Sequence, residues 1–293
     1  MLASPLPCPR SSTAELHTRA VERVIAAMHR RLDESFSLEE MAEVAIMSPF
    51  HFNRIFRRLT GVPPCQFFSA LRLETAKRLL LTTTLSVTDI CFQVGYNSLG
   101  TFTRRFTQLV GLSPQGLRAL ARGGFENLLV QLLSASTWFG DPQLSGPVVE
   151  GEIEAPEDFS GLLFVGLFDS PLPQGHPIAC AWLEGSGRYQ IPDVTGEGHC
   201  LVAAGLELSS TDPRHFLLHD NVLRGGLREQ MVEAGERIGK IFLRSAQATD
   251  PPILLTFPLL ASEALAHEWG GPLALSQGGL PRGGGWLAGG GAP

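Results

Sequence analysis

The sequence predicts a multidomain protein in which an all-α double helix-turn-helix domain is followed by a mostly-β sandwich domain. Apolar residues recur at helical spacing up to about residue 120, whereas short β-like runs separated by Gly and Pro follow from about residue 148. The helical part also contains an internal repeat with an offset of 49 or 50 residues. At 293 residues the chain is long enough for two domains, each with its own core.

The expected domain boundaries follow changes in composition. Residues 1–14 are rich in Pro and Ser and form a loose leader, and Gly123 and Gly124 end the helical domain. The predicted units are a helical domain over 15–122, a linker over 123–147 with a candidate helix at Phe125–Leu133, a β domain over 148–268, and a disordered Gly-rich tail over 269–293.

The repeat begins with two capped helices. Ser37-Leu-Glu-Glu40 and Ser86-Val-Thr-Asp89 each place a Ser at the N-cap and an acidic residue three positions later, as in a capping box. These motifs lie 49 residues apart, whereas the later equivalents lie 50 apart, which predicts a turn one residue longer in the second copy. The later pairs are Phe52 and Phe102, Arg54 and Arg104, Phe56 and Phe106, Gly61 and Gly111, and Pro64 and Pro114.

Each copy has the layout of a helix-turn-helix. The short helices are predicted at Leu38–Ala45 and Val87–Val94, and after a turn the second helices begin at Ser48 and Ser98. A connecting helix over Pro63–Leu81, about 24 Å long, can hold the second helices about one DNA turn, roughly 34 Å, apart. One polypeptide would then reach two adjacent segments of a major groove.

The second helix of each copy is amphipathic, with its paired Phe residues facing the core. The opposite faces carry Asn53, Arg54 and Arg57 in the first copy, and Thr101, Arg104 and Arg105 in the second. Arg can bond guanine and Asn can bond adenine at the base edges of the major groove. Either helix alone is explained better by a solvated polar face, but two copies in register favour DNA binding.

Charge is distributed unevenly between the two parts of the chain. Residues 1–122 carry 15 basic and 9 acidic residues, whereas residues 123–293 carry 8 and 20. A net charge of +6 beside one of −12 indicates that only the first part meets phosphate, although surface charge can also differ between domains without such a cause.

The run from Ser37 to Arg118 closely resembles the DNA-binding domain of the AraC/XylS family of bacterial transcription regulators. The residues that carry the resemblance are Ser37-Leu-Glu-Glu-Met-Ala, Ser48-Pro-Phe-His-Phe-Asn-Arg-Ile-Phe-Arg-Arg-Leu-Thr-Gly61, Arg72 with Ala76 and Leu79-Leu80, Val87-Thr-Asp-Ile90, Val94-Gly-Tyr96, Phe102-Thr-Arg-Arg-Phe106 and Gly111-Leu-Ser-Pro114. A preceding helix over Ala14–Leu32 extends it. Members usually place the sensor domain before the DNA-binding domain, whereas here the second domain follows it.

The resemblance implies a set of DNA contacts. The residues implied at base edges are Phe50, Asn53 and Arg54 in the first unit and Thr101 and Arg104 in the second. The residues implied at phosphates are Ser48 and Ser98, at the helix N-termini, with Arg57 and Arg105. The second unit departs from the family pattern at Leu99, Gly100 and Thr107, where polar or basic residues are frequent, so the first unit is expected to supply most of the discrimination.

The implied partner is double-stranded DNA, and RNA polymerase, a small-molecule effector and a second copy of the chain are further candidates. Whether transcription is activated or repressed stays open.

One family branch carries a repair methyltransferase with a Pro-Cys-His-Arg nucleophile, but Cys8 lies in Leu-Pro-Cys-Pro-Arg without a charge partner, so an enzyme is not expected. No catalytic constellation, cofactor motif or zinc spacing is present.

The scattered cysteines form no CxxC pair and predict reduced thiols in a cytoplasmic, nucleoid-associated protein. They are Cys8, Cys65, Cys91, Cys180 and Cys200. No signal peptide is evident, and the apolar stretch Ile253–Ser262 is interrupted by Pro258 and is too short to span a bilayer, so no membrane association is expected.

The second domain shows short candidate strands at regular spacing, which is typical of a β-sandwich. They lie at Val148–Glu154, Leu162–Phe168, Ile178–Leu183, Gly187–Ile191, His199–Leu206, Phe216–Leu223, Glu229–Val232, Lys240–Arg244 and Ile253–Phe257. Gly187–Val194 followed by Gly198–Ala203 weakly resembles the paired strands of transthyretin-like and carboxypeptidase-regulatory-like sandwiches.

Several residues of this domain are candidates for a site. His215, His219 and Asp220 have a metal-binding spacing, but a structural or surface role is favoured, so no metal is predicted. Cys180 and Cys200 are expected on neighbouring strands as reduced thiols, and two aromatic residues, Trp182 and Tyr189, as core residues or as the lining of an effector pocket. The effector site itself is not assigned. The domain is therefore interpreted as a small-molecule sensor, with a ligand-independent interaction or oligomerisation module as the alternative; a DNA-tethered enzyme lacks a catalytic constellation.

Overall fold

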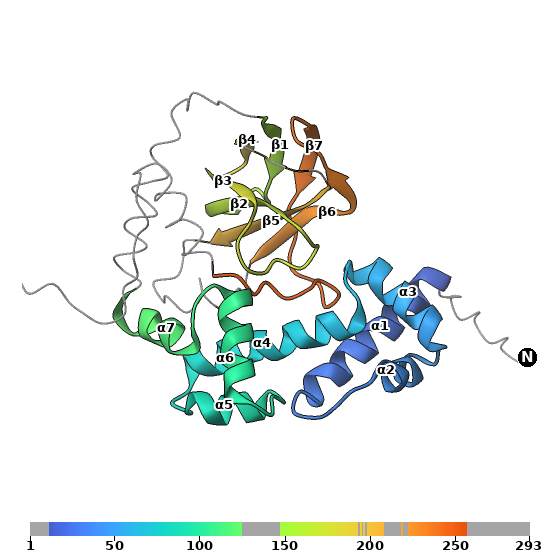
Figure 1. The fold of residues 1–293 in the computed structure, drawn as a ribbon. Coiled ribbons are helices and arrows are strands. Elements are labelled where there is room, and N and C mark those ends of the chain that lie inside the picture. Colours follow the sequence, from blue (N-terminus) through green and yellow to red (C-terminus); the bar gives the residue numbers. More distant parts are fainter. Residues whose placement is uncertain are drawn as a thin grey trace, which may run out of the picture.

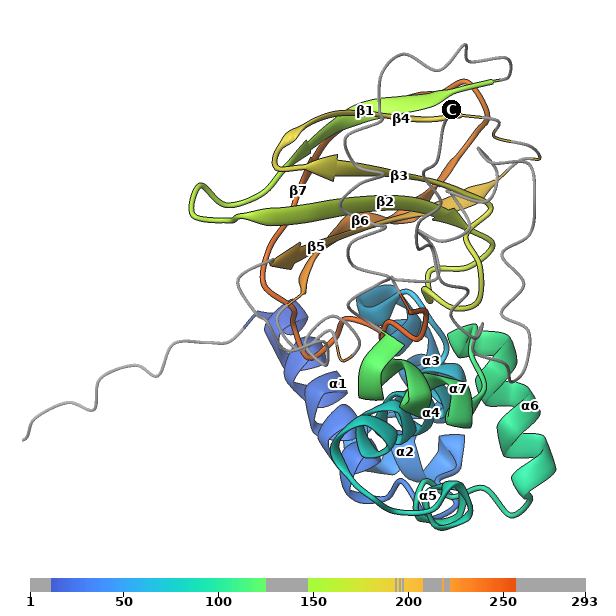
Figure 2. The same cartoon turned by 90° about the vertical axis from the view of Figure 1, so that its left-hand side faces the viewer.

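The computed structural model describes residues 12–124, 147–192, 194, 196, 198–207, 218 and 222–256. A helical domain and a β domain pack against each other (Figure 1). In Figure 2 the β domain lies above the helical domain, and α2 and α5 are on the side away from it. No helix in the described part of the chain is long and apolar enough to cross a membrane.

Seven α-helices form the first domain. They are α1 (Thr13–Arg30), α2 (Leu38–Ala45), α3 (Pro49–Thr60), α4 (Pro64–Thr82), α5 (Val87–Gln93), α6 (Leu99–Val110) and α7 (Pro114–Ala119), and a π-helical segment, η1 (Leu120–Gly124), follows α7. The helices predicted for both repeats and for the connection between them are therefore confirmed. The candidate helix at Phe125–Leu133 lies outside the described residues.

The repeat predicted from sequence is also a repeat of capping structure. Ser37 and Ser86 each form a complete capping box, in which the acidic N3 residue bonds the backbone of the Ser. The longer helices α3 and α6 end at Gly61 and Gly111, with φ of 83° and 90°. A left-handed residue at this position satisfies the last carbonyls of a helix, and glycine adopts it without steric cost.

The β domain contains two sheets among its described residues. Its strands are β1 (Val149–Glu154), β2 (Gly161–Phe168), β3 (Ala179–Glu184), β4 (Gly187–Ile191), β5 (His199–Glu207), β6 (Leu223–Val232) and β7 (Arg237–Phe242). One sheet has the order β4-β1-β7, with β1 and β7 parallel, and the other has the antiparallel order β3-β2-β5-β6.

Two sequence predictions for this domain were wrong. The segment Ile253–Thr256 is not a strand, because its backbone lies against α4 rather than beside another strand, and Phe257 lies outside the described residues. The segments Gly187–Ile191 and His199–Ala203 belong to different sheets and do not pair, because β4 pairs with β1 whereas β5 pairs with β2 and β6. The resemblance to transthyretin-like sandwiches stays a prediction.

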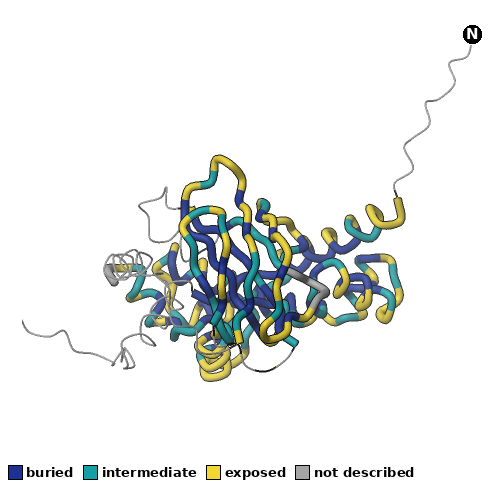
Figure 3. Tube along the Cα trace, turned by 90° about the horizontal axis from the view of Figure 1, so that it is seen from above, coloured by how far each residue is buried: buried dark blue, intermediate teal, exposed yellow. Residues whose placement is uncertain are grey.

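Strand β2 is buried along its whole length because it separates two hydrophobic clusters. Leu163, Val165 and Leu167 join a cluster with residues of the other sheet. Phe164 and Phe168, on the opposite face, join the cluster that continues into the helical domain. Seen from above, buried chain occupies the interior and exposed chain the outer turns and the first turn of α1 (Figure 3).

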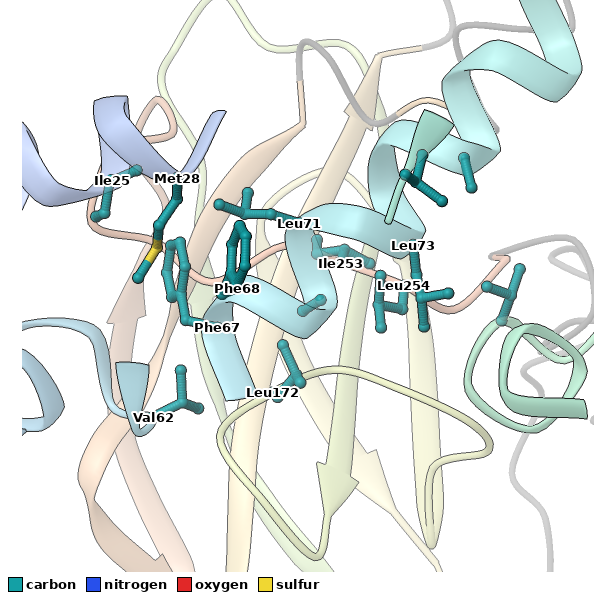
Figure 4. Close-up of a cluster of buried hydrophobic side chains, with 14 of the residues drawn as sticks. Ile25, Met28, Val62, Phe67, Phe68, Leu71, Leu73, Leu172, Ile253 and Leu254 are labelled. Atoms are coloured by element: carbon teal, nitrogen blue, oxygen red, sulfur yellow. The ribbon is translucent and has the colours of Figure 1, made fainter. Parts of the chain in front are cut away.

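The two domains share a buried junction centred on α4. Figure 4 shows Leu172 and Ile253 of the β domain beside Phe68 and Leu71 of α4. Lys77 of α4 is only 1% exposed.

The Lys77 Nζ donates to the carbonyl oxygens of Ile253, Leu254 and Leu255 at 3.3, 3.0 and 3.5 Å. From the β domain, Arg224 Nη1 donates to Pro251 O at 2.7 Å, so the 251–255 segment is held from both sides.

Candidate DNA-binding surface

Helices α3 and α6 are each anchored by two buried Phe residues. The rings of Phe52 and Phe56 lie 5.4 Å apart, and those of Phe102 and Phe106 lie 5.6 Å apart. All four side chains are fully buried. Because the apolar side of each helix is fixed in this way, its opposite side faces solvent.

The exposed side of α3 holds the residues predicted to read bases in the first unit. Phe50 is 83% exposed, and Asn53 and Arg54 are also exposed. An exposed phenyl ring is costly in water and can contact a thymine methyl group in the major groove. Arg54 Nη2 lies 3.3 Å from His51 Nδ1, which can accept from the guanidinium when the imidazole is protonated at Nε2. His51 therefore restrains Arg54 on the exposed side, a relation that the sequence analysis missed.

The exposed side of α6 holds the residues predicted to contact DNA in the second unit. Thr101, Arg104 and Arg105 are exposed, in agreement with the predicted face. Leu99 is 40% exposed and Gly100 is open to solvent, so the first turn offers no polar side chain at these two positions. This placement is consistent with the expectation that the second unit discriminates less.

Both predicted N-cap serines bond their own helices. Ser48 Oγ accepts from His51 N, and Ser98 Oγ accepts from Thr101 N, each at 3.4 Å. Each hydroxyl keeps its proton for donation to a phosphate oxygen, next to the positive end of the helix dipole. Arg57, the remaining predicted phosphate contact of the first unit, is exposed one turn beyond Asn53.

Arg72 of α4 ties the two helix-turn-helix units together. Its Nη2 donates to Glu34 O at 2.5 Å, just before the first unit, and its Nη1 donates to Gly95 O at 3.4 Å, in the turn of the second. Its guanidinium also lies 4.5 Å from the centre of the Phe68 ring. Gly95 has φ of 78°, and an added Cβ would overlap Leu32 O and the Arg72 side chain. The relative position of the two units thus depends on an Arg that the sequence analysis treated only as part of a motif.

The candidate residues of the β domain do not form one site. Strand β2 lies between the strands of Cys180 and Cys200, so the prediction that these strands are neighbours was wrong; neither cysteine forms a disulfide within the described residues. Trp182 packs on Phe164, on the side of the helical domain, whereas Tyr189 is buried between the two sheets. They therefore do not line a common pocket.

Burial raises the pKa of the Tyr189 phenol above its ordinary value. His215, His219 and Asp220 lie outside the described residues, within which no group of three or more His, Cys, Asp or Glu could hold a metal.

Comparison with known proteins identifies the class of the helical domain. Residues 41–119 match the family described as "Helix-turn-helix domain". This part of the chain is therefore a helix-turn-helix domain.

The relatives of this domain are transcription regulators. The chain is 33% identical over 91 residues to the uncharacterized HTH-type transcriptional regulator YobQ of Bacillus subtilis, a match over 31% of this chain and 38% of YobQ. It is 27% identical over 116 residues to the HTH-type transcriptional activator AarP of Providencia stuartii, covering 40% of this chain and 85% of AarP.

A crystal structure of the DNA-binding domain of AdpA with a target DNA is 35% identical, with coverage of 35% of this chain and 93% of that one and a TM-score of 0.34. The helix-turn-helix domain at residues 41–119 is of the AraC type. The chain spans less than half the length of YobQ, so this likeness concerns the helical domain alone.

Proposed function

We infer that this protein is a sequence-specific transcription regulator in which α3 and α6 enter two adjacent segments of a DNA major groove. The observation that carries the proposal is the repeated helix with a buried Phe pair on one side and exposed Arg with Asn or Thr on the other. Guanidinium and amide groups at these positions match the acceptors and donors of guanine and adenine edges. AdpA, a relative by sequence, has been crystallised with its target DNA through the equivalent domain.

The two units take different parts in this proposal. Phe50, Asn53 and Arg54 supply direct readout from α3, and Arg54 is already restrained by His51. Thr101 and Arg104 supply a looser contact from α6. Ser48, Ser98, Arg57 and Arg105 hold phosphates, which sets the register without reading sequence.

The test is selection of bound duplexes from a random pool with the full chain, followed by affinity measurements on the selected duplex and a shuffled one. A sequence-specific regulator prefers its site by about 1,000-fold or more. Arg188→Ala on β4 is a control, because Arg188 is exposed on the β domain, away from both recognition helices. A pool with no enriched sequence contradicts the proposal.

We further propose that the β domain senses a small molecule at the domain junction. A cavity of about 620 Å³ is lined there by residues of both domains, among them Thr60 from the end of α3 and Pro171, Arg224, Phe242 and Asp250 from the β domain. A ligand in this cavity would touch the end of a recognition helix directly. It would shift DNA binding only if its affinity differs between the DNA-competent and incompetent states.

Thermal unfolding of the full chain with a metabolite panel tests the sensing role. A ligand at 100 times its dissociation constant stabilises the folded chain by about 2.7 kcal/mol. Stabilisation that disappears in Phe242→Ala, which removes a 65% exposed aromatic side chain from the cavity lining, supports the junction site. No stabilisation together with concentration-dependent dimerisation favours the alternative, a ligand-independent association module.

A further inference from the structure

The connection between β2 and β3, residues 169–178, reaches from the β domain to both recognition helices. Gly175 N donates to Leu109 O, near the end of α6, at 2.8 Å. Pro171 lies against the end of α3, since a Cβ added to Gly61 would be 3.2 Å from Pro171 Cβ. Figure 1 shows this segment descending from the strands to the helical domain. Its position is fixed by a backbone bond, and Leu172 is buried.

A groove of about 280 Å³ lies between this segment, α4 and α6. Its floor includes Leu172 and Leu254. Its walls carry hydrogen-bond donors from all three elements, namely Gln66 and Ser69 of α4, Arg104, Arg105 and Gln108 of α6, and Gln174 of the β2–β3 connection. No carboxylate is among the described residues that line it. Two guanidinium groups without a facing carboxylate make this a site for an anion.

The groove lies between the two recognition helices. Helix α4 begins four residues after the end of α3, and Gln66 and Ser69 are in its first two turns; α6 forms the opposite wall. When two helices occupy successive major-groove segments on one face of a duplex, the minor groove between those segments also faces the protein. The phosphates that border this minor groove are then the anions nearest to the groove of the protein.

We propose that this groove binds a phosphate of the DNA backbone and that Gln174 makes a DNA contact from the β domain. The proposal rests on the proposed function of the helical domain and adds a contact from the β domain to its DNA-binding surface. Arg105, the proposed phosphate contact of α6, supplies charge, and the Gln174 amide donates a neutral hydrogen bond to a phosphate oxygen. The β domain, although acidic as a whole, is thus part of the DNA-binding surface.

A pair of substitutions with opposite charge tests the role of Gln174. In Gln174→Glu a carboxylate repels the phosphate, and in Gln174→Lys an ammonium attracts it. The probe is a fluorescent mixed-sequence duplex of about 25 base pairs, long enough for two major-groove segments, titrated with the full chain by anisotropy at several salt concentrations. We expect Gln174→Glu to weaken binding about 5-fold with a shallower salt dependence, and Gln174→Lys to tighten it by a similar factor.

Ser160 provides the matched control. It is exposed immediately before β2, at the opposite end of that strand from the β2–β3 connection. Ser160→Glu and Ser160→Lys add the same charges far from the groove, and they should change the affinity much less. Because damage to the junction would act alike in Gln174→Glu and Gln174→Lys, opposite effects of the two variants separate a phosphate contact from structural damage.

Three results would overturn the inference. In the first, the Gln174 variants and the Ser160 variants change the affinity for the duplex by the same factor. In another, Gln174→Ala binds DNA more tightly than the natural chain, which means that the connection obstructs the duplex. If Arg54→Ala still reduces the discrimination between the selected and a shuffled duplex in either case, the proposed function stands and only the contact from the β domain fails. If the chain binds no duplex, the inference fails together with the proposed function.

Discussion

Replacing Lys77 by Met should loosen the junction between the two domains. The chain has only two lysines, Lys77 and Lys240, and their surroundings are opposite. Lys77 is fully buried with its ammonium on three backbone carbonyls, whereas Lys240 is on the surface beside Glu152 and Glu154. Met has nearly the volume and length of Lys, so it removes the donors and the charge while it leaves little empty space.

The size of the destabilisation follows from the backbone carbonyls that lose their hydrogen-bond donor. Ile253, Leu254 and Leu255 are each at most 1% exposed, so their carbonyl oxygens cannot turn to water when the ammonium is removed. A buried acceptor without a partner costs about 1 to 3 kcal/mol. At pH 9 the buried amine is neutral and donates two hydrogen bonds, whose loss costs about 2 kcal/mol at the lower limit. A net loss of about 2 kcal/mol lowers the Tm by about 4 to 8 °C in a chain of this size.

The measurement is thermal and urea unfolding of the full chain, with Lys240→Met as the matched control. Lys240→Met should change the Tm little, because exposed ion pairs contribute little to stability. Labelling with an amine-reactive reagent should modify Lys240 readily and Lys77 only after unfolding. Equal stability of the two Met variants, or rapid labelling of Lys77 in the folded chain, would refute the junction described above.

The same variant makes a prediction about pH. Burial lowers the pKa of Lys77 from its ordinary value of 10.5 to about 7, an effect that Glu74 opposes and Arg224 and Arg78 reinforce. Above pH 7 the unfolded chain then binds a proton that the folded chain has released, so stability rises with pH up to about 10.5. The stability of the natural chain relative to Lys77→Met should therefore increase between pH 7 and 9. A difference that stays constant or shrinks would show that Lys77 keeps its proton in the junction.

Two further predictions concern the recognition helices and the core of the β domain. Arg54→Ala should reduce the discrimination between the selected and a shuffled duplex by about 1 to 3 kcal/mol, and Arg104→Ala by less. An equal or larger loss from Arg104→Ala, measured by anisotropy on both duplexes, would contradict the unequal roles of the two units. Gly151→Ala should lower the free energy of unfolding by about 1 to 3 kcal/mol, because the new Cβ would lie 2.5 Å from Tyr189 Oη. Since that hydroxyl is buried without a partner in the described structure, Tyr189→Phe alone should be nearly neutral. The double variant with Gly151→Ala should recover only part of the loss, because the Tyr189 Cζ atom, which Phe keeps, also lies 2.7 Å from the new Cβ; no recovery at all would argue against this contact.

Local signals explain what could be predicted from the sequence. The capping boxes at Ser37 and Ser86 and the C-terminal glycines of α3 and α6 depend on residues within one turn of each other, so their spacing alone locates the helix ends. The exposed faces of α3 and α6 follow from the same periodicity. His51 beside Arg54 is separated from it by only three residues, and could have been found by examining neighbouring turns of the helix.

The contacts between distant segments could not be predicted in this way. Lys77 and the carbonyl of Leu254 are separated by 177 residues, and an apolar run such as Ile253–Leu255 has the same pattern whether it forms a strand or packs on a helix. The alternation in β3 and β5 indicates which side chains share a face but not which strand lies between them. For that reason Cys180 and Cys200 were expected on adjacent strands, although β2 separates them.

The arrangement of the junction indicates how the β domain can influence both recognition helices. It meets them at corresponding places, near Gly61 at the end of α3 and at Leu109 and Val110 at the end of α6. The second contact is a bond of 3.0 Å from Thr256 Oγ1 to Val110 O, next to the segment held by Lys77. A ligand that moves the 251–256 segment therefore acts on the end of α6 through Thr256 and on α4 through Lys77. If α3 and α6 read one duplex in register, a small displacement at either end changes the affinity at both units.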